Sequence, residues 1–308
     1  MGAPTACLIS RVYIGEIPYI KAFVSHYIRL KFDKIYLIIT RKDEEAEIRS
    51  YLNNYDNIEY LYPLNDGDVK MLYMNHLIPY IKEDYVLHID IDEFLDLGLN
   101  NIKTLFQESL YDKYHFNWAI VVNDGLTSTK VASMGQTHRN KPWKTMCKTS
   151  IIEEWVGAID MKTKTGIEGH HSKYNLIHYW GRSYNDLLIK SIYGNGFKDA
   201  KSCSLESVIK YVDDPDVNEL PNRLKMMAVL SRCDKTINLD NDYCLKYTVV
   251  NKEESLLRGV ISLDQRQRLY TKYVEFRQKL DYKIHIAPYF QLGLLGIEWD
   301  NIKVTKDE

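Results

Sequence analysis

The chain has 308 residues, of which 45% are hydrophobic and 27% are charged, which is sufficient for a large buried core. The 42 acidic and 40 basic side chains leave a formal net charge of −2 at pH 7, so nucleic acid is not an expected partner. No apolar run approaches the ~20 residues that cross a membrane, and we expect neither a membrane span nor a signal peptide. The five dispersed cysteines are typical of a reducing compartment. We therefore expect a cytoplasmic protein.

The first 90 residues alternate between short apolar segments and amphipathic segments. Strands are expected at 6–9, 35–40, 58–62 and 86–90, and helices at 16–28, 44–52 and 69–78. Segment 35–40 is apolar on both faces, as in a central parallel strand. The alternation at ~20–30 residues per unit predicts an α/β fold with a doubly wound, mainly parallel sheet. No glycine-rich phosphate-binding motif follows any strand, so dinucleotide and P-loop sites are not expected.

The second half of the chain changes in character. Strands are expected at 116–122, 144–152 and 174–180, with an irregular segment at 153–172 between the last two. Ser183 and Asp186 form a capping box of the S-x-x-D kind, which predicts a helix that runs to residue 193. Further helices are expected at 205–212, 222–232 and 263–280. We expect a nucleotide-binding and catalytic domain over 1–200 and a helical C-terminal extension over 201–308.

Three acidic residues, Asp90, Asp92 and Glu93, follow directly on the fourth predicted strand. Ionised carboxylates are rarely left unpaired in a protein interior, so they must reach water or bind cations. Open α/β sheets bind ligands at the carboxyl ends of their strands, and alternation places Asp90 and Asp92 on the same side of the chain. This arrangement suits a divalent cation that bridges a phosphorylated ligand. The alternative is a strand that ends in a solvated acidic turn.

Four segments of the chain follow a known sequence pattern. They are 16–20 (Glu-Ile-Pro-Tyr-Ile) with 23–36, then 70–77, then 90–95 (Asp-Ile-Asp-Glu-Phe-Leu), and 177–183 (Ile-His-Tyr-Trp-Gly-Arg-Ser) with Lys190. In these segments the chain resembles nucleotide-sugar-dependent glycosyltransferases of the GT-A type, and among them the family-92-like group and related family-2-like enzymes. The last two segments are the specific ones. The sequence departs from the group at Gly15, where asparagine is common, at His26, which precedes a tyrosine, and at Lys31, which replaces a turn glycine.

The resemblance spans about residues 6–195 and implies a Rossmann-like GT-A fold with a single nucleotide-sugar-binding domain. It implies transfer of a sugar from a nucleotide diphosphate, with a UDP-sugar favoured, to a hydroxyl of a glycan acceptor. Mn²⁺ or Mg²⁺ would assist departure of the diphosphate. Asp92 would bind the metal, Asp90 would orient the ribose and a metal-bound water, and Glu93 would support both. His178 is the candidate third metal ligand, and a hydrogen-bonded histidine inside an apolar strand is its alternative.

Several polar residues are expected around the nucleotide. Arg182 and Lys190 could pair with diphosphate oxygens, and the arginine could do so through its bidentate fork. The alternative for Arg182 is that it ties the strand end to the acidic turn. The other candidates for contacts with the nucleotide are Arg11, Glu16, Asn75 and Lys144. A surface helix start would explain Glu16 as well, and a solvent-facing position would explain Asn75.

The acceptor side of the site is expected from the second half of the chain, where Trp118, Asn123 and Asp124 could form a shelf. A tryptophan within a strand is also a common core residue. An inverting transfer, which the resemblance favours, needs a carboxylate base to remove the proton of the acceptor. The candidates are Glu153, Glu154, Asp160 and Glu168. Of these we favour Asp160 and Glu168.

Two other functions fit an acidic strand end. A Mg²⁺-dependent D-x-D phosphohydrolase would use the aspartates as nucleophile and acid, but it needs a small β-branched residue two positions after the second aspartate, where Phe94 stands. It also needs the motif at the first strand rather than at about the fourth. A carbohydrate-binding module without turnover would not need Asp90 and Asp92 to be retained. Release of nucleoside diphosphate, of inorganic phosphate, or of neither would distinguish the three.

Overall fold

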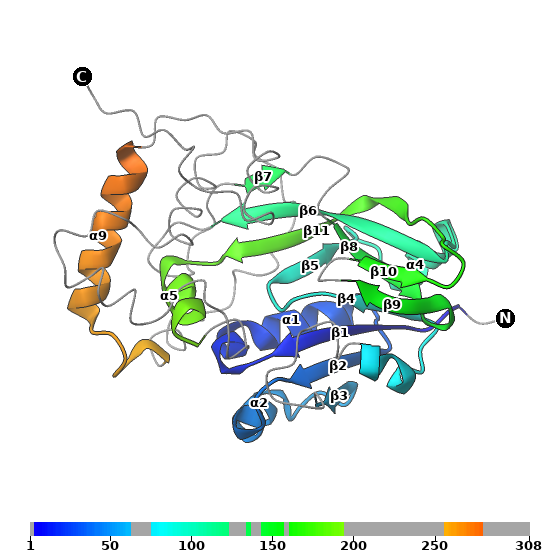
Figure 1. Cartoon of the computed structure of the whole chain (residues 1–308), viewed down its shortest axis with the longest axis horizontal. Coiled ribbons are helices and arrows are strands. Elements are labelled where there is room, and N and C mark those ends of the chain that lie inside the picture. Colours follow the sequence, from blue (N-terminus) through cyan, green and yellow to red (C-terminus); the bar gives the residue numbers. More distant parts are fainter. Residues whose placement is uncertain are drawn as a thin grey trace.

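The computed structural model describes residues 3–62, 75–122, 134–136, 143–156, 160–193 and 256–279 (Figure 1). Asn123, Asp124, most of the helix predicted at 69–78 and the helices predicted at 205–212 and 222–232 lie outside these ranges. Among the described residues, no helix has the length and the apolar character that crossing a membrane requires.

A nine-stranded sheet runs through the described part of the chain in the order β3-β2-β1-β4-β8-β6-β11-β5, with β7 paired to β6. The strands are β1 (Ala6–Val12), β2 (Lys34–Ile39), β3 (Ile58–Leu61), β4 (Tyr85–His88), β5 (Glu93–Asp96), β6 (Lys113–Val122), β7 (Met134–Gln136), β8 (Trp143–Lys148) and β11 (His170–Gly181). Strands β1 to β4, β6 and β11 run parallel, and β5, β7 and β8 run against them. The predicted α/β fold with a mainly parallel sheet is confirmed.

Helices cover one face of this sheet and a small hairpin covers the other (Figure 1). The helices are α1 (Ile17–Arg29), α2 (Glu45–Leu52), α4 (Ile102–Glu108), α5 (Tyr184–Tyr193) and α9 (Leu263–Lys279), with short 3-10 turns η1 (Ile14–Glu16), η2 (Lys42–Glu44), η3 (Ile78–Tyr80) and η4 (Thr149–Ile151). Ala6 and Leu8 of β1 pack with the helices, whereas Cys7 and Ile9 point to the opposite face. Because successive side chains of a strand alternate between faces, a strand buried on both sides is apolar throughout.

The hairpin on the second face corrects one prediction. Residues 153–172 are not irregular, because they contain most of β9 (Ile152–Val156), all of β10 (Asp160–Thr163) and the start of β11, and β9 pairs with β10 in antiparallel register. Ile152, Trp155 and Met161 are its buried apolar side chains, and its outer face is exposed. A hairpin that buries so few apolar residues carries little periodic signal in its sequence. Similarly, the strand predicted at 144–152 is divided by η4.

Helix α9 confirms the helix predicted at 263–280 and packs on α5 at the left of Figure 1. The ring of Tyr184 lies 5.2 Å from that of Tyr270 and 5.6 Å from that of Tyr273, measured between centroids. Leu269 and Tyr273 belong to the same buried cluster as the sheet and α1. The described part of the C-terminal region therefore shares the core of the sheet, and the boundary at residue 200 stays a prediction.

The end of α1 shows how the chain accommodates Lys31 where the resembling group has glycine. Lys31 adopts a left-handed conformation with φ 60°. Its amide donates to the carbonyl of Ile28 at 2.9 Å, and the amide of Phe32 donates to the carbonyl of Tyr27 at 3.2 Å. These two bonds form a Schellman cap, and the Tyr27 and Phe32 rings meet at 5.3 Å. The cap therefore places a residue with a Cβ atom in a conformation that favours glycine.

We expect Lys31→Gly to stabilise the protein, because glycine adopts this conformation without strain and Lys31 is exposed. The expected gain in the free energy of unfolding is about 0.5–1 kcal/mol, measured by urea denaturation. Lys31→Ala is the matched control, since both substitutions remove the side chain beyond the Cβ atom and only alanine keeps that atom. Equal stability of the two variants would show that the left-handed backbone carries no strain.

Candidate active site

Charged side chains gather at the carboxyl edge of the parallel strands. Asp90 follows the end of β4, Arg182 follows the end of β11, and Arg11 lies near the end of β1. Strand β8 runs in the opposite direction, so Lys144 near its start reaches the same edge. Parallel strands in an open sheet bind ligands at this edge. Side chains from distant parts of the sequence thus converge where a ligand is expected.

The turn between β4 and β5 shapes the acidic motif. The amide of Asp90 donates to Oε2 of Glu93 at 2.7 Å, and the amide of Glu93 donates to the carbonyl of Asp90 at 3.0 Å. Lys144 Nζ lies 2.8 Å from Asp90 Oδ2 and 3.2 Å from Glu93 Oε2, and Arg11 Nη2 lies 3.5 Å from Asp90 Oδ1. Burial lowers the pKa of Lys144, but the charges of Asp90 and Glu93 raise it by more. The net pKa of Lys144 therefore lies above its usual value. Lys144 is therefore a buried ammonium group.

Asp92 lies deeper and has its own cation. Lys190 Nζ on α5 donates to Asp92 Oδ2 at 2.8 Å, and His178 Nε2 on β11 lies 3.6 Å from Asp92 Oδ1. Burial alone would raise the pKa of Asp92, but the charges of Lys190 and His178 lower it by more, so the net pKa lies well below its usual range. Asp92 is therefore held in its ionised form by these neighbours.

Arg182 organises the third part of the cluster. Its Nη2 donates to Glu16 Oε2 at 2.6 Å and lies 3.3 Å from Asp186 Oδ1, and its guanidinium stacks over the Tyr19 ring at 3.4 Å. Burial raises the pKa of Glu16 above its usual value, and Arg182 and Lys190 oppose that rise. Arg182 thus ties the end of β11 to η1 and α5 rather than to the acidic turn. Among the residues that the structure describes, its buried Nη1 and Nε atoms have no hydrogen-bond partner.

Most of the predicted site residues are brought together by the fold. The cluster contains Arg11, Glu16, Asp90, Asp92, Glu93, Lys144, His178, Arg182 and Lys190. Trp118 adjoins it, because its ring lies 4.6 Å from that of His178. The local sequence pattern marks Asp186 only as a capping residue, although Asp186 is i+4 from Arg182 and i−4 from Lys190. That helical spacing is the signal that would have placed all three on one face.

Three predicted residues do not join the cluster. Asn75 accepts a hydrogen bond from the amide of Trp155 at 2.7 Å and so contacts the hairpin. Asp160 pairs with Lys113 at 2.9 Å, at the amino end of β6. Glu168 precedes the start of β11 and is exposed. Asp160 and Glu168 therefore lie toward the amino ends of the parallel strands, at the edge opposite to Asp90.

The side chains as placed do not fit the divalent metal that the sequence pattern implies. Among the described residues no group of three histidine, cysteine, aspartate or glutamate side chains could hold a metal ion. Lys144 and Lys190 lie within hydrogen-bond distance of the two aspartates. A metal that bound these carboxylates would compete with both ammonium groups.

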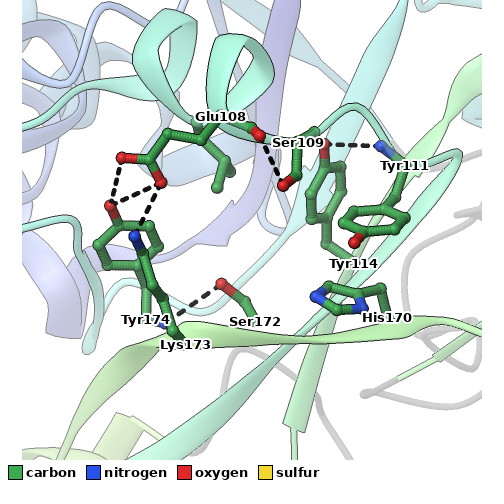
Figure 2. Close-up of a pocket in the computed structure, with 9 residues that line it drawn as sticks. Glu108, Ser109, Tyr111, Tyr114, His170, Ser172, Lys173 and Tyr174 are labelled. Atoms are coloured by element: carbon green, nitrogen blue, oxygen red, sulfur yellow. Dashed lines mark hydrogen bonds and ion pairs between the residues drawn. The ribbon is translucent and has the colours of Figure 1, made fainter.

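A separate cavity of about 340 Å³ lies at the other edge of the sheet (Figure 2). On one side the Tyr111 and His170 rings stack at 3.9 Å, and on the other Glu108 binds Lys173 at 3.0 Å. Tyr174 donates to the same carboxylate at 3.1 Å. Because His170 begins β11, this cavity is at the amino ends of the strands and does not belong to the charged cluster.

The comparisons with known proteins find distant similarities to solved structures. No family model matches the sequence, and no curated protein matches it. The chain is similar to the mannosyltransferase PcManGT of Pyrobaculum calidifontis in complex with GDP-Man and Mn²⁺ (11% identity, 98% of this chain and 89% of that one, TM-score 0.43). It is also similar to residues 1–349 of TarS of S. aureus in complex with UDP-GlcNAc (12% identity, 99% of this chain and 98% of that one, TM-score 0.37). A third similar structure is 4-diphosphocytidyl-2C-methyl-D-erythritol synthase of Anaerococcus prevotii (15% identity, 58% of this chain and 90% of that one, TM-score 0.35). At these identities and TM-scores the similarities carry no conclusion about activity.

Proposed function

We propose that the chain is a glycosyltransferase that moves a sugar from a nucleoside-diphosphate sugar to a hydroxyl of a glycan acceptor, with a UDP-sugar as the favoured donor. The observation that carries the proposal is the cluster of paired charges at the carboxyl edge of the sheet. Asp90, Lys144 and Arg11 form its outer part, and the Asp90 side chain is 31% exposed. A ligand that approaches this edge therefore meets charged groups that the fold already holds in place.

The chemistry needs charge at this position. As the sugar leaves, the bond between its anomeric carbon and the diphosphate oxygen breaks, and the electron pair stays on the diphosphate. The acceptor oxygen bonds to the same carbon, and its proton passes to a base. Preorganised cations lower the barrier by stabilising the negative charge that develops. Arg11 has the most exposed side chain of the four cations in the cluster, at 14%, so it is the group that we expect the diphosphate to meet first.

The finer assignments stay predictions. An inverting transfer needs a carboxylate base beside the acceptor, and neither Asp160 nor Glu168 lies at the edge that holds Asp90. Mn²⁺ dependence would require the metal to compete with Lys144 and Lys190 for the two aspartates. The cytoplasmic location also stays a prediction.

Slow hydrolysis of the donor tests the proposal. The chain is incubated with a panel of UDP- and GDP-sugars, once with Mn²⁺ and once with EDTA, and released nucleoside diphosphate and inorganic phosphate are measured separately. We expect nucleoside diphosphate from one donor, because water can replace the acceptor. Release of inorganic phosphate from simple phosphomonoesters would indicate a phosphohydrolase instead. Donor binding in thermal-shift assays without any release, even with acceptor glycans, would indicate a binding module.

A further inference from the structure

Each aspartate of the acidic motif is already bound by a buried ammonium group. Lys144 Nζ lies 2.8 Å from Asp90, and Lys190 Nζ lies 2.8 Å from Asp92. The two ammonium groups together carry the same formal charge as one divalent cation. They occupy the two carboxylates that such a cation would bridge.

Neither lysine is free to leave its aspartate. The side chains of Lys144 and Lys190 are only 1% and 7% exposed. Each is held on a second side, Lys144 by Glu93 at 3.2 Å and Lys190 by Asp186 at 3.5 Å. Breaking a buried ion pair by removing one partner is strongly destabilising. A divalent ion that entered beside them would also be repelled by two positive charges at short range.

The nearby histidine does not complete a metal site. His178 Nε2 is 3.6 Å from Asp92, and His178 Nδ1 is 4.0 Å from Glu93. Its ring also packs against Trp118, with centroids 4.6 Å apart, in the manner of a core histidine. His178 therefore supports the acidic motif from the side, and Lys144 and Lys190 are the cations that lie at 2.8 Å from Asp90 and Asp92.

We infer that Lys144 and Lys190 take the place of the divalent cation in this site, so that the protein binds its donor without metal. The part concerning the donor rests on the proposed function; the part concerning the metal does not. The two ammonium groups neutralise Asp90 and Asp92, so the edge does not repel a diphosphate. As the sugar departs, we expect their charge to stabilise the negative charge that develops on the diphosphate.

Binding of Mn²⁺ by the protein without nucleotide tests the first part, with free Mn²⁺ measured by electron paramagnetic resonance. We expect no saturable binding below about 1 mM, the weak end of protein sites for hard cations. Lys190→Met should raise the affinity for Mn²⁺ at least about tenfold, because it uncovers Asp92 and removes a repelling charge. Lys190→Arg should leave binding absent, since the charge stays. Lys173→Met is the surface control, because that lysine is 69% exposed and pairs with Glu108 at the other edge.

One Mn²⁺ bound tightly per wild-type chain, and lost in Asp92→Asn, would overturn the inference. Circular dichroism establishes which variants fold. If Lys190→Met does not fold, Lys144→Met supplies the same test at Asp90, and Lys190→Arg against wild type retains the comparison at Asp92.

Donor binding tests the second part. Thermal shift and calorimetry with the donor found by the hydrolysis screen should give the same affinity in EDTA and in Mn²⁺, within about twofold. In Lys190→Met the affinity in EDTA should fall at least about tenfold, since truncating one partner of a buried charge pair has effects of that size. Binding only in the presence of Mn²⁺ would overturn the inference and leave the proposed function intact. Binding of no donor in either buffer would overturn the proposed function and, with it, this role of the lysines.

Discussion

Asp92→Ala should abolish sugar transfer while the protein stays folded. Asp92 holds Lys190 at 2.8 Å and faces His178 at 3.6 Å, so its loss frees the cation that the site uses. Removing one preorganised group that stabilises developing charge lowers the rate of an enzyme by about 10²–10³-fold. We expect a loss of this size in turnover, measured as the release of nucleoside diphosphate in the presence of acceptor.

The fold should tolerate the change, because Lys190 keeps a second carboxylate, Asp186, at 3.5 Å. Circular dichroism and the thermal midpoint establish that the variant is folded. Asp112→Ala is the matched control: this aspartate is 44% exposed and pairs with the surface residue Lys148 at 3.4 Å. A folded Asp92→Ala protein with the wild-type rate would remove Asp92, and with it the charged cluster, from the chemistry.

Arg182→Met should produce the largest loss of stability. Arg182 is 3% exposed and is the shared partner of Glu16 and Asp186, both buried. Methionine fills a similar volume but leaves two carboxylates without this partner. Breaking a buried ion pair from one side costs about 3–5 kcal/mol, and we expect a decrease of this size in the free energy of unfolding in urea at pH 7.

The loss of stability in Arg182→Met should also depend on pH, and the environment of Glu16 determines the direction of this dependence. Burial already raises the pKa of Glu16 above its usual value of 4.5, and Arg182 opposes that rise; without Arg182 the pKa rises further. A carboxyl group whose pKa is raised by folding stabilises the fold below its unfolded pKa, and that stability is lost as pH increases through the folded pKa. The variant should therefore be less impaired at pH 5 than at pH 7.

The double variant Glu16→Gln/Arg182→Met provides the control. Because the two residues are in contact, its loss should be smaller than the sum of the two single losses. Additive losses, or a loss in Arg182→Met that does not change between pH 5 and pH 7, would contradict the pairing seen in the structure.

Local sequence patterns predicted most of the fold that carries the site. Strands β1, β2, β3 and β4 lie where apolar runs were expected, and α5 begins at the Ser183 capping box, where the amide of Asp186 donates to Ser183 Oγ at 2.8 Å. Each of these features depends on residues within a few positions of one another. The β9–β10 hairpin was missed because its two strands bury few apolar side chains, namely those of Ile152, Trp155 and Met161.

The amino-acid sequence by itself determined that a strand runs into Asp90 and Asp92, and that these carboxylates must find positive partners or water. Only the tertiary structure decided which partners they find. Lys144 is 54 residues from Asp90, Lys190 is 98 from Asp92, and Arg182 is 166 from Glu16. Such distances along the chain are bridged by strand order and strand direction, and no local pattern encodes either. The same directions carry Asp160 and Glu168 to the far edge of the sheet, because a residue near the start of a parallel strand lies a strand's length from one at its end.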